Sequence, residues 1–183
     1  MKESINLTGR LIEQCKKGDE RARYAVYKQY VHAMYNVAYR ITAHQFDAED
    51  VVQEAFVKAF KKIHTLKHTH TFGGWLKQIV VNESISLVRR QKRLSQAFES
   101  MDSLPDEVNE GLPDMDFPME KVMAAILALP EGARVVFTLR AIEDYKFNEI
   151  AEMTGQSVNN CKVQYHRSKK ILSSQLKNSV YAN

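Results

Sequence analysis

The sequence predicts an all-α fold of two helical domains, joined by an acidic, flexible linker, with a helix-turn-helix at the C-terminal end. Apolar residues recur at helical spacing through most of the 183 residues, whereas Gly and Pro, which mark tight turns, total only 7 and 4. Residues 97–120 include eight acidic residues and no Lys or Arg. Residues 147–172 have the spacing of two short helices joined by a tight turn. The acidic segment therefore separates two regions of helical pattern.

The charge distribution indicates a polyanionic partner. The formal net charge is +4 and the isoelectric point is about 9.0. Because the acidic segment carries −8, the rest of the chain carries +12, and basic regions of this kind suit a protein that binds a polyanion. Cys15 and Cys161 fall within helical patterns, which favours a reduced, cytoplasmic protein without disulfides. No apolar run approaches the roughly 18 residues of a membrane span, so we expect no membrane insertion.

Four helices are predicted in the N-terminal domain, with suitable residues between them. Gly18 can end the first helix, Asp19 can cap the second, and Asp47 can cap the third. The tyrosines of the second helix, among them Tyr24 and Tyr30, share its apolar face, which favours core packing; a stacking platform for bases is the alternative. The predicted helices are 7–17, 20–42, 47–63 and 72–93.

The third predicted helix has an acidic outer face in its N-terminal half and lysines in its C-terminal half. This arrangement complements the helix dipole, which is one explanation. An acidic face on a DNA-binding protein is not expected to touch DNA, so the other explanation is a docking face for a basic protein partner. The face comprises Asp47, Glu49, Asp50, Gln53 and Glu54.

The predicted loop 64–71 contains three histidines and a lysine ahead of two aromatic residues. No acid or cysteine lies near the histidines, so we expect no metal site. Exposed Lys67 and His68 beside Phe72 and Trp75 better suit single-stranded nucleic acid, in which bases stack on rings and cations neutralise phosphates. Trp75 could equally anchor the core. Basic residues end the helix that follows, where they also complement the helix dipole.

The C-terminal domain is predicted to contain helices 118–129 and 130–144 followed by the helix-turn-helix. Ala151 lies where two crossing helices need a small side chain, and Gly155 lies where the turn needs positive φ. In this motif the second helix enters the DNA major groove. The second helix here is basic, although a basic face that only meets solvent is the alternative. Its candidate DNA-facing residues, basic for phosphates and amide for base edges, are Asn159, Asn160, Lys162, Val163, Gln164, His166, Arg167 and Lys170.

The order of these parts closely resembles the bacterial RNA polymerase sigma factors, in the extracytoplasmic-function (ECF) group of the sigma-70 family. The resemblance covers about residues 10–177, and two separate segments match in the right order with a linker between them. It depends on AEDVVQEAFVKAFKKI at 48–63, FGGWLKQIVVNESISLVRR at 72–90, LPEGARVVFTLRAIEDYKFNEIAEMTG at 129–155 and SVNNCKVQYHRSKKIL at 157–172.

The resemblance implies a transcription initiation factor that is not an enzyme and needs no cofactor. Such a factor binds core RNA polymerase and directs initiation by recognising the −10 and −35 promoter elements. Residues 7–95 would form sigma region 2, 96–117 the acidic linker, and 118–178 sigma region 4. The alternative is a helix-turn-helix repressor or activator that acts without being a polymerase subunit, which would leave the acidic face unexplained.

The resemblance also implies roles for particular residues. The acidic face would dock on the β′ clamp helices, the C-terminal domain would meet the β flap and read the −35 element, and an anti-sigma factor is an expected partner. The loop and fourth helix would recognise and open the −10 element, with candidates Lys67, His68, Phe72, Trp75 and Asn82, and with Lys77, Arg89 and Arg90 on phosphates.

Two departures from the family pattern concern the helix-turn-helix. The recognition helix often shows a Thr-Val-Lys-Ser-Arg-like run, whereas here the run from Asn160 ends in Gln164. Arg is a preferred reader of guanine and Gln of adenine, so the −35 sequence is expected to differ. Lys146 stands where a capping Ser is common, so the first helix of the motif is expected to begin less firmly.

Overall fold

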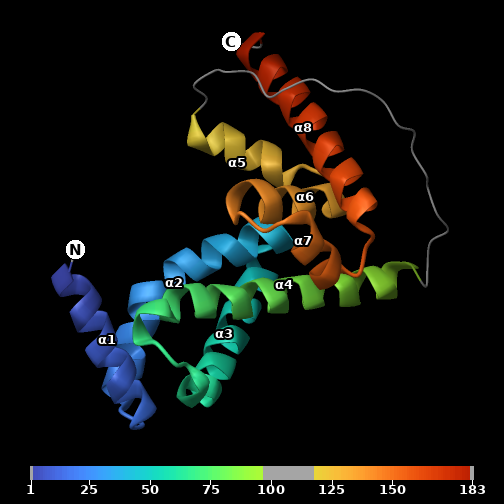
Figure 1. The fold of residues 1–183 in the computed structure, drawn as a ribbon. Coiled ribbons are helices and arrows are strands. Elements are labelled where there is room, and N and C mark those ends of the chain that lie inside the picture. Colours follow the sequence, from blue (N-terminus) through green and yellow to red (C-terminus); the bar gives the residue numbers. More distant parts are fainter. Residues whose placement is uncertain (1, 97–117, 182–183) are drawn as a thin grey trace. The chain divides into compact units, whose positions relative to one another are not determined.

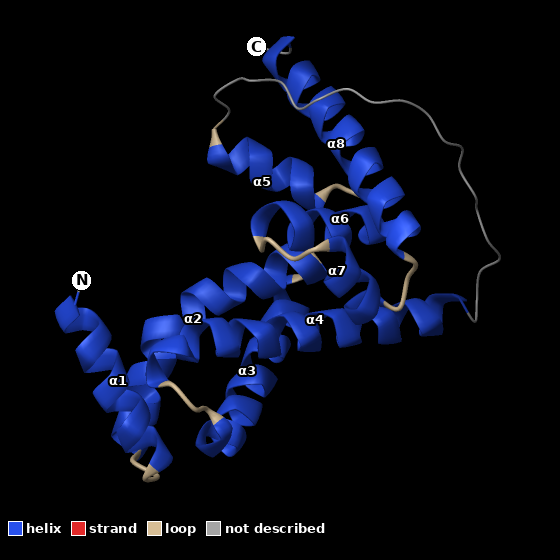
Figure 2. Cartoon of the chain, viewed as in Figure 1, coloured by secondary structure: helices blue, strands red, loops and turns tan. Residues whose placement is uncertain are grey.

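The computed structural model describes residues 2–96 and 118–181, and within these two ranges it is all-α, as predicted. Eight α-helices, two short 3-10 helices and one π-helical turn occur in the described ranges, with no strand (Figure 2). The chain forms two compact units, residues 1–88 and 89–183 (Figure 1). The predicted linker lies, apart from Gln96, outside the described residues, and the predicted domain bounds 7–95 and 118–178 stay predictions.

The first unit is a bundle of the four predicted helices, although α1 begins five residues earlier than predicted. Gly18 adopts φ +88° after the first helix, and the Asp19 carboxylate accepts a hydrogen bond from the Ala22 N–H at 3.1 Å, as an N-cap does. Apolar side chains such as Ile12 and Val80 are fully buried between the helices. The helices are α1 (Lys2–Lys16), α2 (Glu20–Thr42), α3 (Gln45–Lys62) and α4 (Phe72–Gln96), the last of which continues past residue 88 into the second unit.

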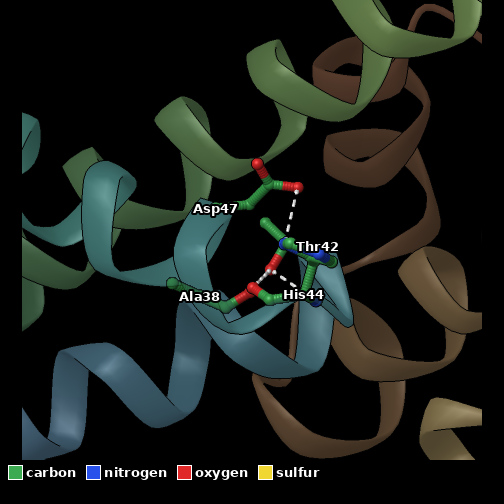
Figure 3. A network of polar contacts seen from close by, with 4 residues as sticks. All are labelled: Ala38, Thr42, His44 and Asp47. Carbon is green, nitrogen blue, oxygen red and sulfur yellow. Dashed lines mark hydrogen bonds and ion pairs between the residues drawn. The ribbon is translucent and has the colours of Figure 1, made fainter.

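The predicted capping role of Asp47 is wrong, because α3 begins two residues earlier. Ala43 adopts the left-handed conformation, φ 57°, and turns the chain so that His44 is the N-cap. Figure 3 shows the contacts that hold this turn: the Thr42 hydroxyl donates to the Ala38 carbonyl at 3.1 Å and accepts from the His44 N–H at 3.4 Å. Asp47 is the third helical residue, and its carboxylate lies 3.7 Å from His44 Nδ1.

The inward placement predicted for Tyr24 is also wrong. Its side chain is 63% exposed, with Lys28 Nζ 5.7 Å from the ring centroid. Tyr24 precedes the fully buried Val26 by two positions, which is about 200° around a helix and therefore on the other side. Tyr30 is half-buried as predicted, and its ring meets the edge of Phe72 with centroids 5.3 Å apart.

The segment between α3 and α4 is more regular than the predicted loop. Two 3-10 helices, Ile63–Thr65 and Thr69–Thr71, account for most of it. Ile63, Leu66 and Phe72 are buried along this segment and attach it to the core. The residues between these anchors remain exposed or half-buried. The segment is therefore attached to the core at three points and exposes side chains between them.

The second unit packs a long C-terminal helix against three shorter ones. Pro118 and Pro130 are the N-caps of its first two helices, close to the predicted starts. The predicted helix 130–144 is interrupted, because Thr138–Ile142 forms a π-helical turn. A core of buried residues that includes Ile126, Leu129, Phe137, Leu172 and Leu176 fills the space between the helices. The helices are α5 (Met119–Leu127), α6 (Glu131–Phe137), α7 (Phe147–Thr154) and α8 (Val158–Tyr181).

A buried arginine joins two of these helices. Arg134 of α6 is buried, and its Nη1 donates to the Leu129 carbonyl at 3.1 Å, beyond the end of α5. Burial lowers the pKa of Arg134, and the nearby Glu131 acts in the opposite direction. No helix among the described residues is long and apolar enough to cross a bilayer.

We predict that two adjacent glycines of α4 respond differently to the same substitution. A Cβ atom at Gly73 would lie 3.1 Å from Tyr30 Cε1, whereas one at Gly74 would meet nothing within 4 Å. Because Ala favours a helix over Gly, Gly74→Ala should raise the free energy of unfolding by about 0.5–1 kcal/mol. Gly73→Ala should give a smaller gain or a loss, since Tyr30 must move. Urea unfolding of both variants tests this, and equal changes would contradict the close approach of Tyr30.

Candidate nucleic-acid and partner interfaces

Of the five residues predicted for the acidic face of α3, three are exposed to solvent. Asp50, Gln53 and Glu54 are exposed and lie at i, i+3 and i+4, which is one side of the helix. Asp47 and Glu49 are half-buried. The structure therefore places the three exposed residues together, with the other two at the N-terminal edge of the face.

Two apolar residues that the sequence reasoning missed extend this face. Phe46 is 69% exposed and Val57 is 45% exposed. The spacing 46, 50, 53 and 57 follows one side of a helix, so an acidic and amide centre lies between two apolar ends. The sequence does show an apolar residue at each end of a polar side of this helix, and that pattern could have indicated them. A face of this composition suits a protein partner with cations at its centre and apolar contacts at its margins.

Lys58 links this face to α4. Its Nζ lies 2.7 Å from Glu83 Oε2 and 3.4 Å from Glu54 Oε1. The hydrogen bond to Glu83 is the main cause that raises the pKa of Lys58, and burial opposes it. One acid of the candidate docking face is thus paired with a lysine that also holds α3 against α4. No pattern in the sequence indicates this pair, because Lys58 and Glu83 lie on different helices.

The segment before α4 places Lys67 and His68 in solvent, as predicted, but not Phe72. Phe72 is fully buried, so its ring belongs to the core and is not available to a base. Trp75 is half-buried, and its ring centroid lies 5.9 Å from that of Phe72. One part of the Trp75 ring therefore supports the core, while the rest can meet a ligand. In the part of the chain that the structure describes, no cluster of three His, Cys, Asp or Glu residues suits a metal ion.

The exposed side of α4 continues from Trp75. Asn82 is exposed at i+7 from Trp75, and its side-chain oxygen accepts from Gln78 Nε2 at 3.3 Å. Arg89 and Arg90 are exposed further along the helix. Lys77 follows Trp75 by two positions and is half-buried, so helical geometry places it on a different side. The helix thus carries a strip of aromatic, amide and basic groups to which Lys77 does not belong.

The helix-turn-helix has the predicted geometry. Ile150, Ala151 and Cys161 are buried at the crossing of α7 and α8, and Gly155 adopts φ +71°. The Gly155 N–H donates to the Ala151 carbonyl at 2.9 Å, which ends α7. The two helices are therefore joined by the left-handed glycine turn that the sequence predicts.

A cap at the start of α8 was not predicted. The Ser157 hydroxyl accepts from the Asn160 N–H at 3.1 Å, and the Asn160 side chain donates to Gln156 Oε1 at 2.9 Å. Serine before a helical pattern was the available signal. These bonds hold the first turn of α8, where two of the candidate base-reading residues lie.

Six of the eight residues predicted on α8 are exposed, and the other two are half-buried. Gln164 is half-buried against α6, where a Cβ atom at Gly132 would lie 3.6 Å from Gln164 Nε2. Arg167 is also half-buried. The inner side holds Cys161 and Leu172, which are buried. The exposed members of the predicted set are Asn159, Asn160, Lys162, Val163, His166 and Lys170.

Comparison with known families and structures matches both units. Residues 26–94 match the family model of sigma-70 region 2, and residues 119–172 match that of sigma-70, region 4. The RNA polymerase sigma factor SigV of Bacillus subtilis is 31% identical over 143 residues, which cover 78% of this chain and 83% of SigV. The ECF RNA polymerase sigma-E factor of Escherichia coli K12 is 30% identical over 152 residues, which cover 77% and 79% of the two chains.

Two solved structures have a similar fold. CnrH, in complex with the cytosolic domain of CnrY, aligns with a TM-score of 0.53 and 25% identity over 93% of this chain and 97% of CnrH. The sigma factor RpoE of Bartonella quintana, in complex with the anti-sigma factor NepR, aligns with a TM-score of 0.54 and 20% identity over 84% and 96% of the two chains. The second likeness concerns the fold alone.

We predict that Lys146→Ser stabilises the second unit. Lys146 is the N-cap of α7, and its N–H donates to Glu149 Oε2 at 2.6 Å, but a lysine side chain cannot accept the N–H of Glu149 in return. A serine hydroxyl can, so the free energy of unfolding should rise by about 0.5–1 kcal/mol. Lys146→Ala is the matched control, since it removes the lysine without adding an acceptor. Urea unfolding in which both variants behave alike would contradict the capping argument.

Proposed function

We propose a division of labour between the two units of this chain, which belongs to the extracytoplasmic-function group of the sigma-70 family. The chain is an RNA polymerase sigma factor that directs promoter-specific initiation, and the observation that carries this conclusion is the ordered match of regions 2 and 4. A repressor that acts without polymerase would not account for region 2. We further propose that the chain catalyses no reaction itself, leaves the chemistry to the polymerase, and acts with it in the cytoplasm.

In the proposal, α3 docks the first unit on core polymerase. The exposed Asp50, Gln53 and Glu54 meet the β′ clamp helices, with Asp47 and Glu49 at the border of the contact. Exposed carboxylates at i and i+4 offer a cationic partner a fixed pattern, which favours specificity and rapid association. The second unit meets the β flap. Polymerase binding thereby leaves the rest of each unit's surface available for DNA.

The −10 element is proposed to meet the segment before α4 and the exposed strip of that helix. Lys67, His68, Trp75 and Asn82 receive the opened strand, since a flipped base can stack on the Trp75 ring and pair with polar groups beside it. Phe72 supports this surface from the core and does not touch DNA. Phosphates are neutralised by Arg89 and Arg90, with Lys77 serving phosphates from another side of the helix.

The −35 element is proposed to meet α8 in the major groove. The first turns of α8 carry the base readers, because residues near the N-terminus of a recognition helix reach base edges. Basic residues further along α8 contact phosphates and make binding salt-dependent. The base readers are Asn159, Asn160, Lys162, Val163 and Gln164, and the phosphate contacts are His166, Arg167 and Lys170.

An anti-sigma protein is proposed as a further partner. The similar sigma factor RpoE of Bartonella quintana is seen in complex with the anti-sigma factor NepR. An exposed face with acidic and apolar residues, such as that of α3, suits a protein that competes with polymerase for the same contacts.

We predict that transcription depends on the docking face. Purified chain and core polymerase should give promoter-specific run-off transcripts from a promoter library, and Asp50→Lys should weaken core binding by roughly tenfold or more, as expected when a like charge replaces an attractive one in an interface. Glu13→Lys is the matched control, because Glu13 is an exposed acid on α1 of the same unit, outside the proposed face. Clean duplex binding by the chain alone, without specific transcripts, would favour a repressor.

We predict that residue 164 sets part of the −35 sequence. Glutamine pairs with adenine and arginine with guanine, so Gln164→Arg should shift the base preferred at one −35 position, with a discrimination of about 1–3 kcal/mol. Gln164→Ala should lose preference at that position without gaining another. Selection from a randomised −35 library measures both variants, and an unchanged preference in Gln164→Arg would remove this residue from the base readers.

A further inference from the structure

The segment proposed to receive the −10 strand is supported by a helix outside the family match. Region 2 is matched from residue 26, whereas α1 spans Lys2–Lys16. Gly9 of α1 lies directly against Thr69, so that a Cβ atom at residue 9 would come within 3.2 Å of Thr69 Oγ1. That distance is shorter than an ordinary van der Waals contact. A side chain at residue 9 therefore requires a shift of a few tenths of an ångström in Thr69 or in α1.

Several contacts attach α1 firmly to the rest of the unit. Ile12 and Cys15 are fully buried, and Thr8 Oγ1 accepts a hydrogen bond from Gln29 Nε2 of α2 at 3.1 Å. A helix held in this way is costly to move, because its buried side chains and the hydrogen bond would have to move with it. The close approach at Gly9 is therefore relieved more readily by Thr69, which is half-buried between the buried anchors Leu66 and Phe72, than by α1.

Thr69 is coupled to the proposed DNA-contacting residues. It begins the short helix Thr69–Thr71, immediately after Lys67 and His68. The N–H and the hydroxyl of Thr71 both donate to the His68 carbonyl, at 3.1 Å and 2.8 Å. Thr69 is covalently joined to His68, and the two hydrogen bonds close the turn from His68 to Thr71 around it, so a displacement of Thr69 moves this turn, His68 included.

We propose that α1 positions the −10 recognition segment, with Gly9 as the positioning residue and Thr69 as the residue through which it acts. The inference rests on the proposed function, because it assumes that the segment containing Lys67 and His68 meets DNA. Gly9 itself touches no nucleic acid. It permits the close approach that sets where Lys67 and His68 stand relative to Trp75.

The test is a double-mutant cycle on the holoenzyme. Core polymerase carrying wild-type, Gly9→Ala, Thr69→Ala or the doubly substituted chain is titrated with a single-stranded −10 oligonucleotide, taken from a promoter that the wild-type holoenzyme selects. Gly9→Ala should weaken oligonucleotide binding by roughly three- to tenfold, within the range of coupling between contacting residues. Thr69→Ala removes the hydroxyl that the new Cβ would meet, so the double variant should bind as Thr69→Ala does.

Core-polymerase affinity and thermal unfolding separate positioning from a general structural role. Core-polymerase affinity should be unchanged in Gly9→Ala, and thermal unfolding should change little, because the helix preference of Ala offsets the close approach to Thr69. Leu7→Ala is the matched control on α1, since Leu7 is 62% exposed and should leave oligonucleotide binding unchanged. Unchanged binding by Gly9→Ala, a defect that Thr69→Ala does not relieve, or a parallel loss of core affinity or thermal stability would each overturn the inference. A wild-type chain that supports no promoter-specific transcription would instead refute the proposed function.

Discussion

The burial of Phe72 against Tyr30 is the contact on which the candidate −10 surface depends. The two rings meet edge to face, with centroids 5.3 Å apart, and Phe72 is fully buried. Aromatic pairs of this geometry add to the free energy that burial alone supplies. Phe72 also ends the 63–71 segment and begins α4. One buried ring therefore sets both the end of the exposed segment and the start of the helix whose Trp75 stands beside it.

The close approach of Tyr30 also explains one of the two glycines at the start of α4. Gly73 lies under the Tyr30 ring, where a Cβ atom would be crowded, whereas Gly74 faces open space. Glycine is a poor helix residue, and its presence at residue 73 has a packing reason. Nothing in the structure explains why residue 74 is also a glycine.

How far the sequence predicts this molecule depends on the range of each interaction. The turn glycines Gly18 and Gly155 and the cap at Asp19 were predicted correctly, because a few neighbouring residues determine them. The start of α3 was predicted two residues too late, because no local pattern indicates that Ala43 adopts a left-handed conformation. The DNA-contacting role predicted for Phe72 is wrong for another reason. An aromatic residue beside a polar loop has the same sequence signature whether its ring faces a base or the core.

Contacts between elements were the least predictable part of the candidate site. The Lys58–Glu83 pair and the Gly9–Thr69 approach each join two elements that are far apart along the chain. Helical periodicity states which residues share a side of one helix, but not which side of another helix lies opposite. The sequence therefore predicts the polar residues of the candidate site, whereas the contacts that support them are seen only in the folded unit.

The half-buried state of Gln164 bears on how the second unit can discriminate between promoters. Its amide lies beside Gly132 of α6, while the neighbouring Asn160 is exposed and is held by Gln156. A side chain that already rests on its own domain loses little conformational freedom when it binds, but it reaches less far into the groove. A small number of base-reading side chains of this kind discriminates only weakly between DNA sequences when it acts alone. The two candidate DNA surfaces of one chain can compensate for this, because the preferences for two elements add when both must be bound, and once one is bound the other is held at a high effective concentration near its own element.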